Sequence, residues 1–251
     1  MKRITLGLLV ISVALILSSA DRVAAQRHRG TAASRTPPTT ECSANITNIA
    51  DCPEAGCGEN GDSELNRAKN RIDVPGQSDI QHMTFASMRS LAQPLRWNTG
   101  DDRSSIKGPG KEGTHVDLKG FLVKIKPEGG ESCNCGLTRR VDTDVHLALV
   151  AAPEDGEETS VTAELTPRVR ANGHPDWLYA KVKDLEGEFI RVTGWLMLDT
   201  KHIRQTQFLP DEHINRPLTR ATNWEVHPVL KLEVCHQSIA ACNANQGWEE
   251  F

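Results

Sequence analysis

Two short segments of alternating polarity constrain the fold of this chain most. Residues 143–150 read Thr-Asp-Val-His-Leu-Ala-Leu-Val, and residues 160–168 read Ser-Val-Thr-Ala-Glu-Leu-Thr-Pro-Arg. In both segments apolar residues alternate with polar ones, which is the pattern of a strand with one buried face. An antiparallel pair of these strands would place Asp144, His146 and Glu164 on one common surface, opposite the apolar face.

Three further segments alternate in the same way, and one short helix is expected between them. The expected strands are His115–Lys126, Glu188–Leu198 and Thr222–Cys235, and the expected helix is Pro175–Leu185. The order strand, strand, strand, helix, strand, strand matches the OB-fold. We therefore predict a mainly β protein: a five-stranded OB-like barrel over residues 114–235, with a short helix between strands three and four. A small β-sandwich is the competing architecture.

The first 25 residues have the features of a secretory signal peptide. Lys2 and Arg3 precede the apolar run Ile4–Leu17, and small residues end at Ala25 before Gln26. An uncleaved anchor is the alternative interpretation. The sequence predicts an exported protein, periplasmic or secreted, with no membrane span after signal removal.

The rest of the N-terminal region, residues 26–113, is expected to be an extension of the barrel. It begins with a flexible arm, followed by a loop-rich segment, Cys42–Gly61, that a disulfide closes. Helical spacing predicts short helices at Asp62–Arg71 and Thr84–Leu91. Residues 236–251 are expected to form a tail without fixed structure.

Seven cysteines fit an oxidising compartment, and their odd number leaves at least one outside an intrachain disulfide. We expect Cys133 and Cys135 to form disulfides with distant partners. Cys235 is a natural partner for one of them, and Cys242 is the expected free thiol. A soft-metal site at Cys133-Asn-Cys135 is the weaker alternative.

The strongest chemical signal is a set of polar residues on one face of three strands. The last strand reads Trp224-Glu-Val-His-Pro-Val, so Glu225 and His227 point outward if Trp224 and Val226 point inward. In an OB barrel this strand lies beside the third one, and the expected common face then carries Asp144, His146, Glu164, Glu225 and His227. OB-folds usually bind their ligands over the second and third strands.

Three interpretations of this face remain open. Asp144, His146 and His227 could hold a divalent transition metal such as zinc. Glu164 could act as a general base while Arg168 or Arg140 holds an anionic group. The third interpretation is structural: cross-strand ion pairs covered by residues 41–113. His202 and His213, in the polar loop 199–220, are expected to be solvated.

The charge of the predicted barrel disfavours nonspecific nucleic-acid binding. Residues 114–235 hold 15 Lys and Arg against 19 Asp and Glu, a balance of −4. A small ligand, a metal, an envelope polymer or a protein partner fits this balance better.

Several short motifs of the chain are distinctive as a set: Glu131-Ser-Cys-Asn-Cys135, Asp144-Val-His146, Glu164-Leu-Thr-Pro-Arg168, Val192-Thr-Gly-Trp-Leu196, Trp224-Glu-Val-His-Pro228, Leu65–Arg71 and Trp97–Arg103. With these motifs, the chain resembles a family of exported bacterial proteins of uncharacterised function with an OB-like domain, from about Cys42 to Cys235. The resemblance implies an exported OB-like protein and transfers no catalytic residue. We expect an OB-like binding domain, with two alternatives: a metal-dependent hydrolase such as a phosphodiesterase, or a structural envelope module.

Overall fold

The computed structural model describes residues 41–59, 61–203 and 219–251, which belong to a compact unit from Ala33 to Phe251. The predicted signal peptide, the predicted arm at residues 26–40 and His213 lie outside the described residues, so those predictions stay predictions. Among the described residues, no helix is long and apolar enough to cross a membrane.

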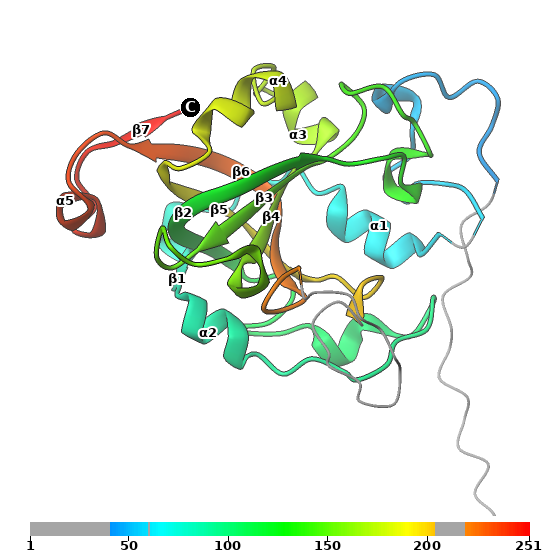
Figure 1. Cartoon of the computed structure of the whole chain (residues 1–251). Helices are drawn as coiled ribbons and strands as arrows, with labels where there is room; N and C mark the ends of the chain where they lie inside the picture. The colour runs from blue at the N-terminus through cyan, green and yellow to red at the C-terminus, as the bar shows by residue number, and fades with distance from the viewer. Residues whose placement is uncertain (1–40, 60, 204–218) are drawn as a thin grey trace, which may run out of the picture. The chain divides into compact units, whose positions relative to one another are not determined.

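Five strands close into a barrel (Figure 1). They are β2 (His115–Pro127), β3 (Val145–Val150), β4 (Val161–Leu165), β5 (Phe189–Leu198) and β6 (Trp224–Cys235). The strands pair in the order β2-β3-β4-β6-β5, and β5 pairs back onto β2. Within this ring β4 and β6 run parallel, and the other neighbours run antiparallel. The predicted OB-like barrel is confirmed, because a sandwich would leave the ring open.

The connection between β4 and β5 is helical, as predicted, but it holds more than one helix. It contains α3 (Pro167–Ala171), α4 (Tyr179–Val182) and the 3-10 turn η6 (Lys183–Leu185). The helix α3 was not predicted from the sequence. Its start has a plain local cause: the Thr166 side chain accepts a hydrogen bond from the Val169 amide, and Pro167 occupies the first helical position.

The apolar faces of the strands fill the barrel. The β3–β4 register pairs Val145 with Leu165 and Leu147 with Ala163, all of them buried in the main core. Because side chains alternate along a strand, this register directs the intervening His146 and Glu164 outward together. Trp195 and Trp224 also belong to the core, as expected.

Gly120 in β2 marks a close approach. A Cβ atom at Gly120 would lie 2.6 Å from the ring of Phe85 and 2.8 Å from the Val150 carbonyl oxygen. The irregularity in the β2–β3 register falls slightly later, between Leu122 and Lys124. This glycine therefore admits the aromatic ring of a neighbouring helix to the strand.

The N-terminal extension packs against the barrel. It contains η1 (Ile49–Asp51), α1 (Ser63–Lys69), η2 (Gln77–Asp79), β1 (Gln81–Met83), α2 (Phe85–Ser90) and η3 (Arg103–Ile106). The two predicted helices are confirmed, with Asp62 and Thr84 as their N-caps. The strand β1, which pairs in parallel with β2, was not predicted from the sequence.

Three disulfides join Cys42 to Cys57, Cys52 to Cys135, and Cys235 to Cys242. The first closes the loop-rich segment, and the second ties the extension to the loop after β2, as expected for Cys135. Three predictions are wrong. Cys242 is not the free thiol, and Cys235 pairs with Cys242, 7 residues further along the chain, rather than with a cysteine of the 133–135 segment. The thiol outside these disulfides is Cys133, which was expected in a disulfide and is buried instead.

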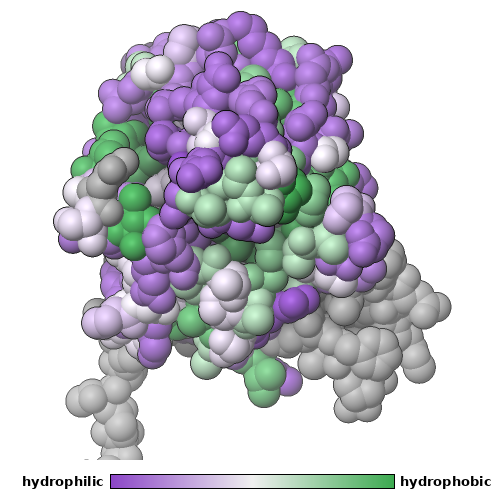
Figure 2. Space-filling model, turned by 90° about the vertical axis from the view of Figure 1, so that its left-hand side faces the viewer, coloured by the Kyte–Doolittle hydropathy of each residue, from purple (hydrophilic) through white to green (hydrophobic). Residues whose placement is uncertain are grey.

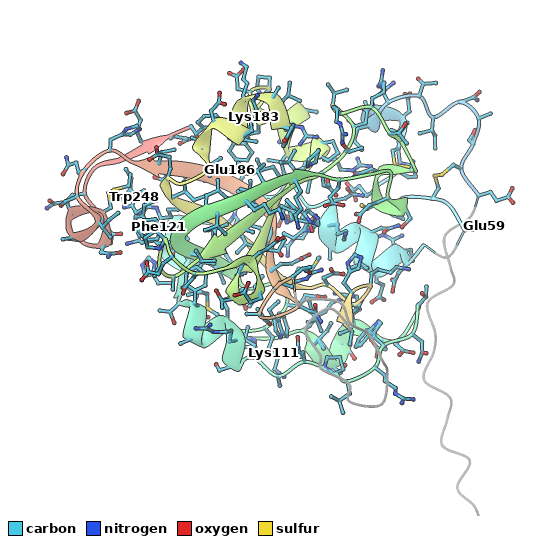
Figure 3. The ribbon with its side chains drawn as sticks, viewed as in Figure 1. Glu59, Lys111, Phe121, Lys183, Glu186 and Trp248 are labelled. Atoms are coloured by element: carbon cyan, nitrogen blue, oxygen red, sulfur yellow. A yellow bond between two sulfur atoms is a disulfide. The ribbon has the colours of Figure 1, made fainter. Side chains whose placement is uncertain are left out.

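The C-terminal segment is also ordered, contrary to the expected tail. It forms α5 (Ile239–Asn243) and β7 (Trp248–Glu250), and β7 pairs with β6. The ring of Phe189 packs against Phe121 and against Trp248, which anchors this segment to the barrel (Figure 3). Figure 2 shows this side of the molecule, where apolar side chains lie in the surface among polar ones.

Candidate functional site

Three neighbouring strands carry the predicted polar face. His146 on β3 pairs in register with Glu164 on β4, and Ala163 on β4 pairs with Val226 on β6. Because Val226 points into the core, its neighbours Glu225 and His227 point outward. The expected common face is therefore present, and it is set by the period of the strands rather than by loops.

Glu164 lies between the two histidines. Its Oε1 is 2.6 Å from His146 Nε2, and its Oε2 is 3.0 Å from His227 Nδ1. Neither contact has the alignment of a good hydrogen bond, so charge and proximity hold these groups. Both histidines lie on the same side of the barrel, which is the geometry that a shared metal site requires.

The network continues beyond Glu164 in both directions. His146 Nδ1 is 3.1 Å from a carboxylate oxygen of Glu128. His227 Nδ1 is 3.1 Å from Glu225, whose other oxygen accepts from Arg220 at 3.0 Å. A line of alternating charges thus runs across the outer face of the barrel.

The far end of this line was missed from the sequence. Arg220 donates to Asp199 at 2.7 Å, and Asp199 lies 2.6 Å from His202 Nδ1. The expectation that His202 is simply solvated is therefore wrong. The sequence does contain one signal, since Asp199 directly follows the last residue of β5. In the structure Leu198 pairs with Trp224, which brings this strand end beside the start of β6.

The ionisable side chains of this cluster are buried, so their charged forms are costly unless neighbouring charges stabilise them. Asp144 is 1% exposed, Glu164 1% and His227 0%. Burial, together with the charges of Glu131 and Glu164, raises the pKa of Asp144 to about 7. Burial also disfavours the ionised form of Glu164, but the charges of His146 and His227 prevail and hold its pKa well below the usual value.

The pKa values of the two histidines are raised, whereas that of Glu164 is lowered. Burial lowers the pKa of His146, but the charge of Glu164 outweighs it and raises that pKa to about 9. The same balance, with Glu164 and Glu225 as partners, raises the pKa of His227 to about 10. The carboxylates of this cluster thus favour positive charge at their centre.

Asp144 differs from its neighbours because its buried carboxylate lacks the partners that a purely structural network would provide. Neither of its carboxylate oxygens has a hydrogen-bond partner among the described residues, although both are buried. One donor atom each from Asp144, Glu164 and His227 lies within 4.8 Å of the other two. Two carboxylates and one imidazole are a donor set that transition metals accept in proteins.

Arg168 is engaged elsewhere. Its Nη2 donates to the carbonyl oxygens of Cys52 and, at 2.9 Å, of Pro53. The residue therefore holds the N-terminal extension against α3. The predicted catalytic roles of Glu164 and Arg168 stay predictions.

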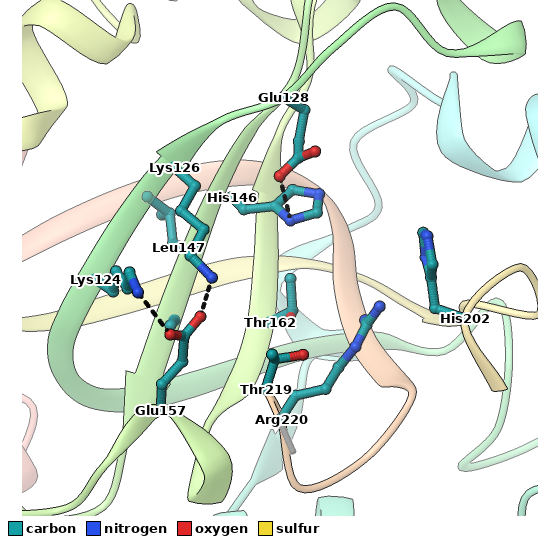
Figure 4. A pocket seen from close by; sticks show the side chains of 11 residues that line it. Lys124, Lys126, Glu128, His146, Leu147, Glu157, Thr162, His202, Thr219 and Arg220 are labelled. Atoms are coloured by element: carbon teal, nitrogen blue, oxygen red, sulfur yellow. Dashed lines mark hydrogen bonds and ion pairs between the residues drawn. The ribbon is translucent and has the colours of Figure 1, made fainter. Parts of the chain in front are cut away.

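Two pockets adjoin the cluster. One, of about 210 Å³, opens at His146 and is lined also by Lys124, Lys126, Thr162 and Arg220 (Figure 4). In Figure 4 the Lys124 and Lys126 ammonium groups both point to Glu157, so their charges are partly matched. The second pocket, of about 510 Å³, lies along α1 and includes His227 in its lining.

The N-terminal extension covers part of the cluster. Lys69 of α1 is 3% exposed, and its ammonium lies 2.8 Å from a carboxylate oxygen of Glu131. This coverage is what the structural interpretation predicted, while the convergence of donors is what the metal interpretation predicted. Coverage alone does not separate the two, because buried metal centres are also shielded by protein.

Comparisons with known proteins add little to this assignment. No protein-family model and no curated protein matches the chain. Two solved structures of asparaginyl-tRNA synthetase from Entamoeba histolytica are similar in part. The complex with asparaginyl-adenylate is 19% identical, with 51% of this chain and 22% of that chain covered and a TM-score of 0.27. The other is 12% identical, with 66% and 27% covered and a TM-score of 0.30.

This chain spans about a quarter of the length of those synthetases. Similarity at this level carries no functional argument, so the OB-like fold rests on the strand order of the barrel itself.

Proposed function

We propose that this chain is an exported OB-like domain that binds a divalent transition metal such as zinc through Asp144, Glu164 and His227. The observation that carries the proposal is the Asp144 carboxylate, buried and unpartnered within ligand distance of two further donors. A buried carboxylate without a partner is costly, and a bound cation removes that cost.

The neighbouring residues fit a role in shaping such a site. His146, which was predicted as a ligand, contacts Glu164 and Glu128 and would orient the Glu164 carboxylate. Glu225 contacts the His227 ring in the same way. Partners of this kind fix the direction and basicity of metal ligands.

The three disulfides support export, because such bonds persist in oxidising compartments. The signal-like segment of residues 1–25 and the resemblance to exported bacterial proteins point the same way. The negative charge of the barrel favours a cation over nonspecific nucleic acid as its partner.

Metal content tests this proposal. The full exported chain is purified without a chelator or a histidine tag, beside Asp144→Asn and a matched control, Asp117→Asn. Asp117 is a buried acid on β2, paired with His82. We expect near-stoichiometric zinc in the parent and in the control, and none in Asp144→Asn. Metal-free parent protein that also fails to take up added zinc would leave the structural role as the better account.

A second candidate is a metal-dependent hydrolase, such as a phosphodiesterase. The pocket at His146 favours it, since Lys124, Lys126 and Arg220 line a space beside the cluster that could receive an anionic ester. Hydrolysis of bis(p-nitrophenyl) phosphate by the zinc-loaded chain, lost in Glu164→Gln, is the expected result for a hydrolase. Stoichiometric zinc without turnover would leave the binding domain as the function.

A further inference from the structure

A second set of metal donors adjoins the first and uses a residue that the proposed function leaves unexplained. Cys133 is 2% exposed and lies outside the three disulfides. One donor atom each from Glu131, Cys133 and Asp144 lies within 4.8 Å of the other two. This set is separate from that of Asp144, Glu164 and His227, and the two share Asp144 alone.

The segment that carries Cys133 is held firmly in place. Cys133 lies in the 3-10 turn η4 (Ser132–Asn134), two residues before Cys135, which forms the disulfide to Cys52. Its carbonyl oxygen accepts from the Asn70 side chain at 2.8 Å. The amide of Cys57 donates to the neighbouring Ser132 carbonyl at 3.0 Å. The thiol is therefore positioned by the extension and the barrel together, as metal ligands usually are.

Asp144 has the features of a bridging carboxylate. Both of its oxygens lack a hydrogen-bond partner among the described residues, and the side chain is 1% exposed. One oxygen is thus left for each donor set. We propose that a second, thiolate-ligated ion binds at Glu131, Cys133 and Asp144, so that Asp144 bridges a two-metal centre. This inference rests on the proposed metal site at Asp144, Glu164 and His227.

The donors define the class of ion. A thiolate selects zinc, cobalt, cadmium or another ion of similar softness over calcium and magnesium, which prefer oxygen. On binding, the Cys133 S–H bond breaks, a sulfur–metal bond forms and the proton leaves to the buffer. Before that step the Cys133 thiol donates to the Glu131 carboxylate, with 3.2 Å between Sγ and Oε2, so this carboxylate is the first acceptor available to the proton.

Lys69 supplies positive charge to this set in the protein without metal. Its ammonium, 2.8 Å from Glu131, would compete with an incoming ion for that carboxylate. The second ion should therefore bind more weakly than the first. Lys69→Gln, which removes the competing charge and keeps a polar side chain, should tighten the second ion more than the first, because Lys69 contacts Glu131 directly and acts on Asp144 and Glu164 only through its charge.

Cobalt titration of the full, disulfide-intact, metal-free chain tests the inference. We expect two bound Co²⁺ ions and a near-ultraviolet thiolate-to-cobalt charge-transfer band that grows with the second one. Cys133→Ser should bind one ion without the band, and Asp144→Asn should bind neither ion. Two ions without a thiolate band, or one ion without it, would overturn the inference and leave the first site intact.

The failure of the proposed function has a different signature. No cobalt at all, or a single ion with a thiolate band that His227→Gln leaves unchanged, would overturn the site at Asp144, Glu164 and His227. If Cys133→Ser does not fold, zinc X-ray absorption of the parent decides the question. A sulfur shell at about 2.3 Å supports the thiolate ligand, and a shell of nitrogen and oxygen alone contradicts it.

Discussion

Two buried ionic sites of this protein are equally inaccessible to water but differ in how their charges are satisfied. In the first, Arg103 and Glu112 are nearly fully buried, and Arg103 Nε donates to Glu112 at 2.9 Å. The remaining donors of Arg103 reach Thr200 at 2.9 Å and the Leu198 carbonyl at 2.8 Å. The Leu198 amide donates to Glu112 at 3.2 Å, so each polar group of this site has a partner.

The second site, around Asp144, Glu164 and His227, is buried to the same degree but is not closed in this way. Asp144 has no hydrogen-bond partner among the described residues, and the two charges that act on it most strongly are the carboxylates of Glu131 and Glu164. A saturated ion pair fixes loops and strands to one another, whereas a buried carboxylate without a partner is an incomplete structure that a cation completes. The structural pair and the ligand site are therefore distinguished by whether their buried polar groups have partners, and not by how deeply these groups are buried.

The largest effect on the metal-free protein is expected at the saturated pair. Arg103→Leu would leave Glu112 buried without its partner, so we expect a loss of about 3–5 kcal/mol in the free energy of unfolding. Urea denaturation measures it. Zinc content should be unchanged in protein that folds, because Arg103 contacts neither donor set. A loss below about 1 kcal/mol would mean that the pair is less important than its geometry indicates.

A somewhat smaller effect is expected when the extension is released from the cluster. The Cys52–Cys135 disulfide spans 83 residues, whereas Cys235–Cys242 spans 7. Replacing both Cys52 and Cys135 by Ala should cost about 2–4 kcal/mol, because a long loop gains more freedom in the unfolded chain. The matched double substitution at Cys235 and Cys242 should cost less. Equal losses in urea denaturation would contradict this loop-length argument.

The pH dependence of stability distinguishes the two buried sites. Because the folded pKa values of His146 and His227, about 9 and 10, lie above the usual histidine value of 6.5, folding favours their protonated forms. That stabilisation is complete below pH 6.5 and is lost as pH rises through 9 and 10. We expect metal-free protein to become steadily less stable between neutral pH and the upper end of this window.

Arg103→Leu should keep this slope, since it leaves both histidines in place, and His227→Gln should reduce it. Unfolding free energies at several pH values measure both slopes. A parent whose stability is flat above neutral pH would show that the histidines are not held protonated by Glu164.

Strand period and element order predicted the barrel and the shared polar face, because both depend on local alternation. Asp144, Glu164 and His227 were found in this way, since a strand fixes which face each residue joins. The core positions of Trp195 and Trp224 followed from the same alternation.

Contacts between distant segments could not be predicted. The position of Cys133 beside Asp144 depends on how η4 is held by Cys52 and Asn70, and no local pattern encodes this. Arg168 was expected at the site because it lies near Glu164 in sequence, but α3 turns it toward the extension. The pairing of Cys235 with Cys242 depends on α5, which holds Cys242 in a segment that was expected to lack fixed structure.

The smallest effect, and the most diagnostic one, concerns Asp144 itself. Replacing a buried acid usually destabilises a protein, but Asp144 has no hydrogen bond to lose, and the charges of Glu131 and Glu164 act on it more strongly than those of His227 and Lys69. Asp144→Asn removes one negative charge and adds donors that these carboxylates can accept. We therefore expect the metal-free variant to gain about 1 kcal/mol at pH 8 over the parent.

The control is Asp117→Asn, which weakens the contact of Asp117 with His82 at 2.7 Å and should lose stability or leave it unchanged. With excess zinc the order should reverse, because only the parent and the control gain the free energy of metal binding. Thermal and urea denaturation with and without zinc measure all six cases. A metal-free Asp144→Asn protein that is clearly less stable than the parent would place Asp144 with Arg103 and Glu112, as a structural charge. If Asp144→Asn is more stable than the parent without zinc and less stable with zinc, the Asp144 carboxylate destabilises the metal-free protein and stabilises the metal-bound one.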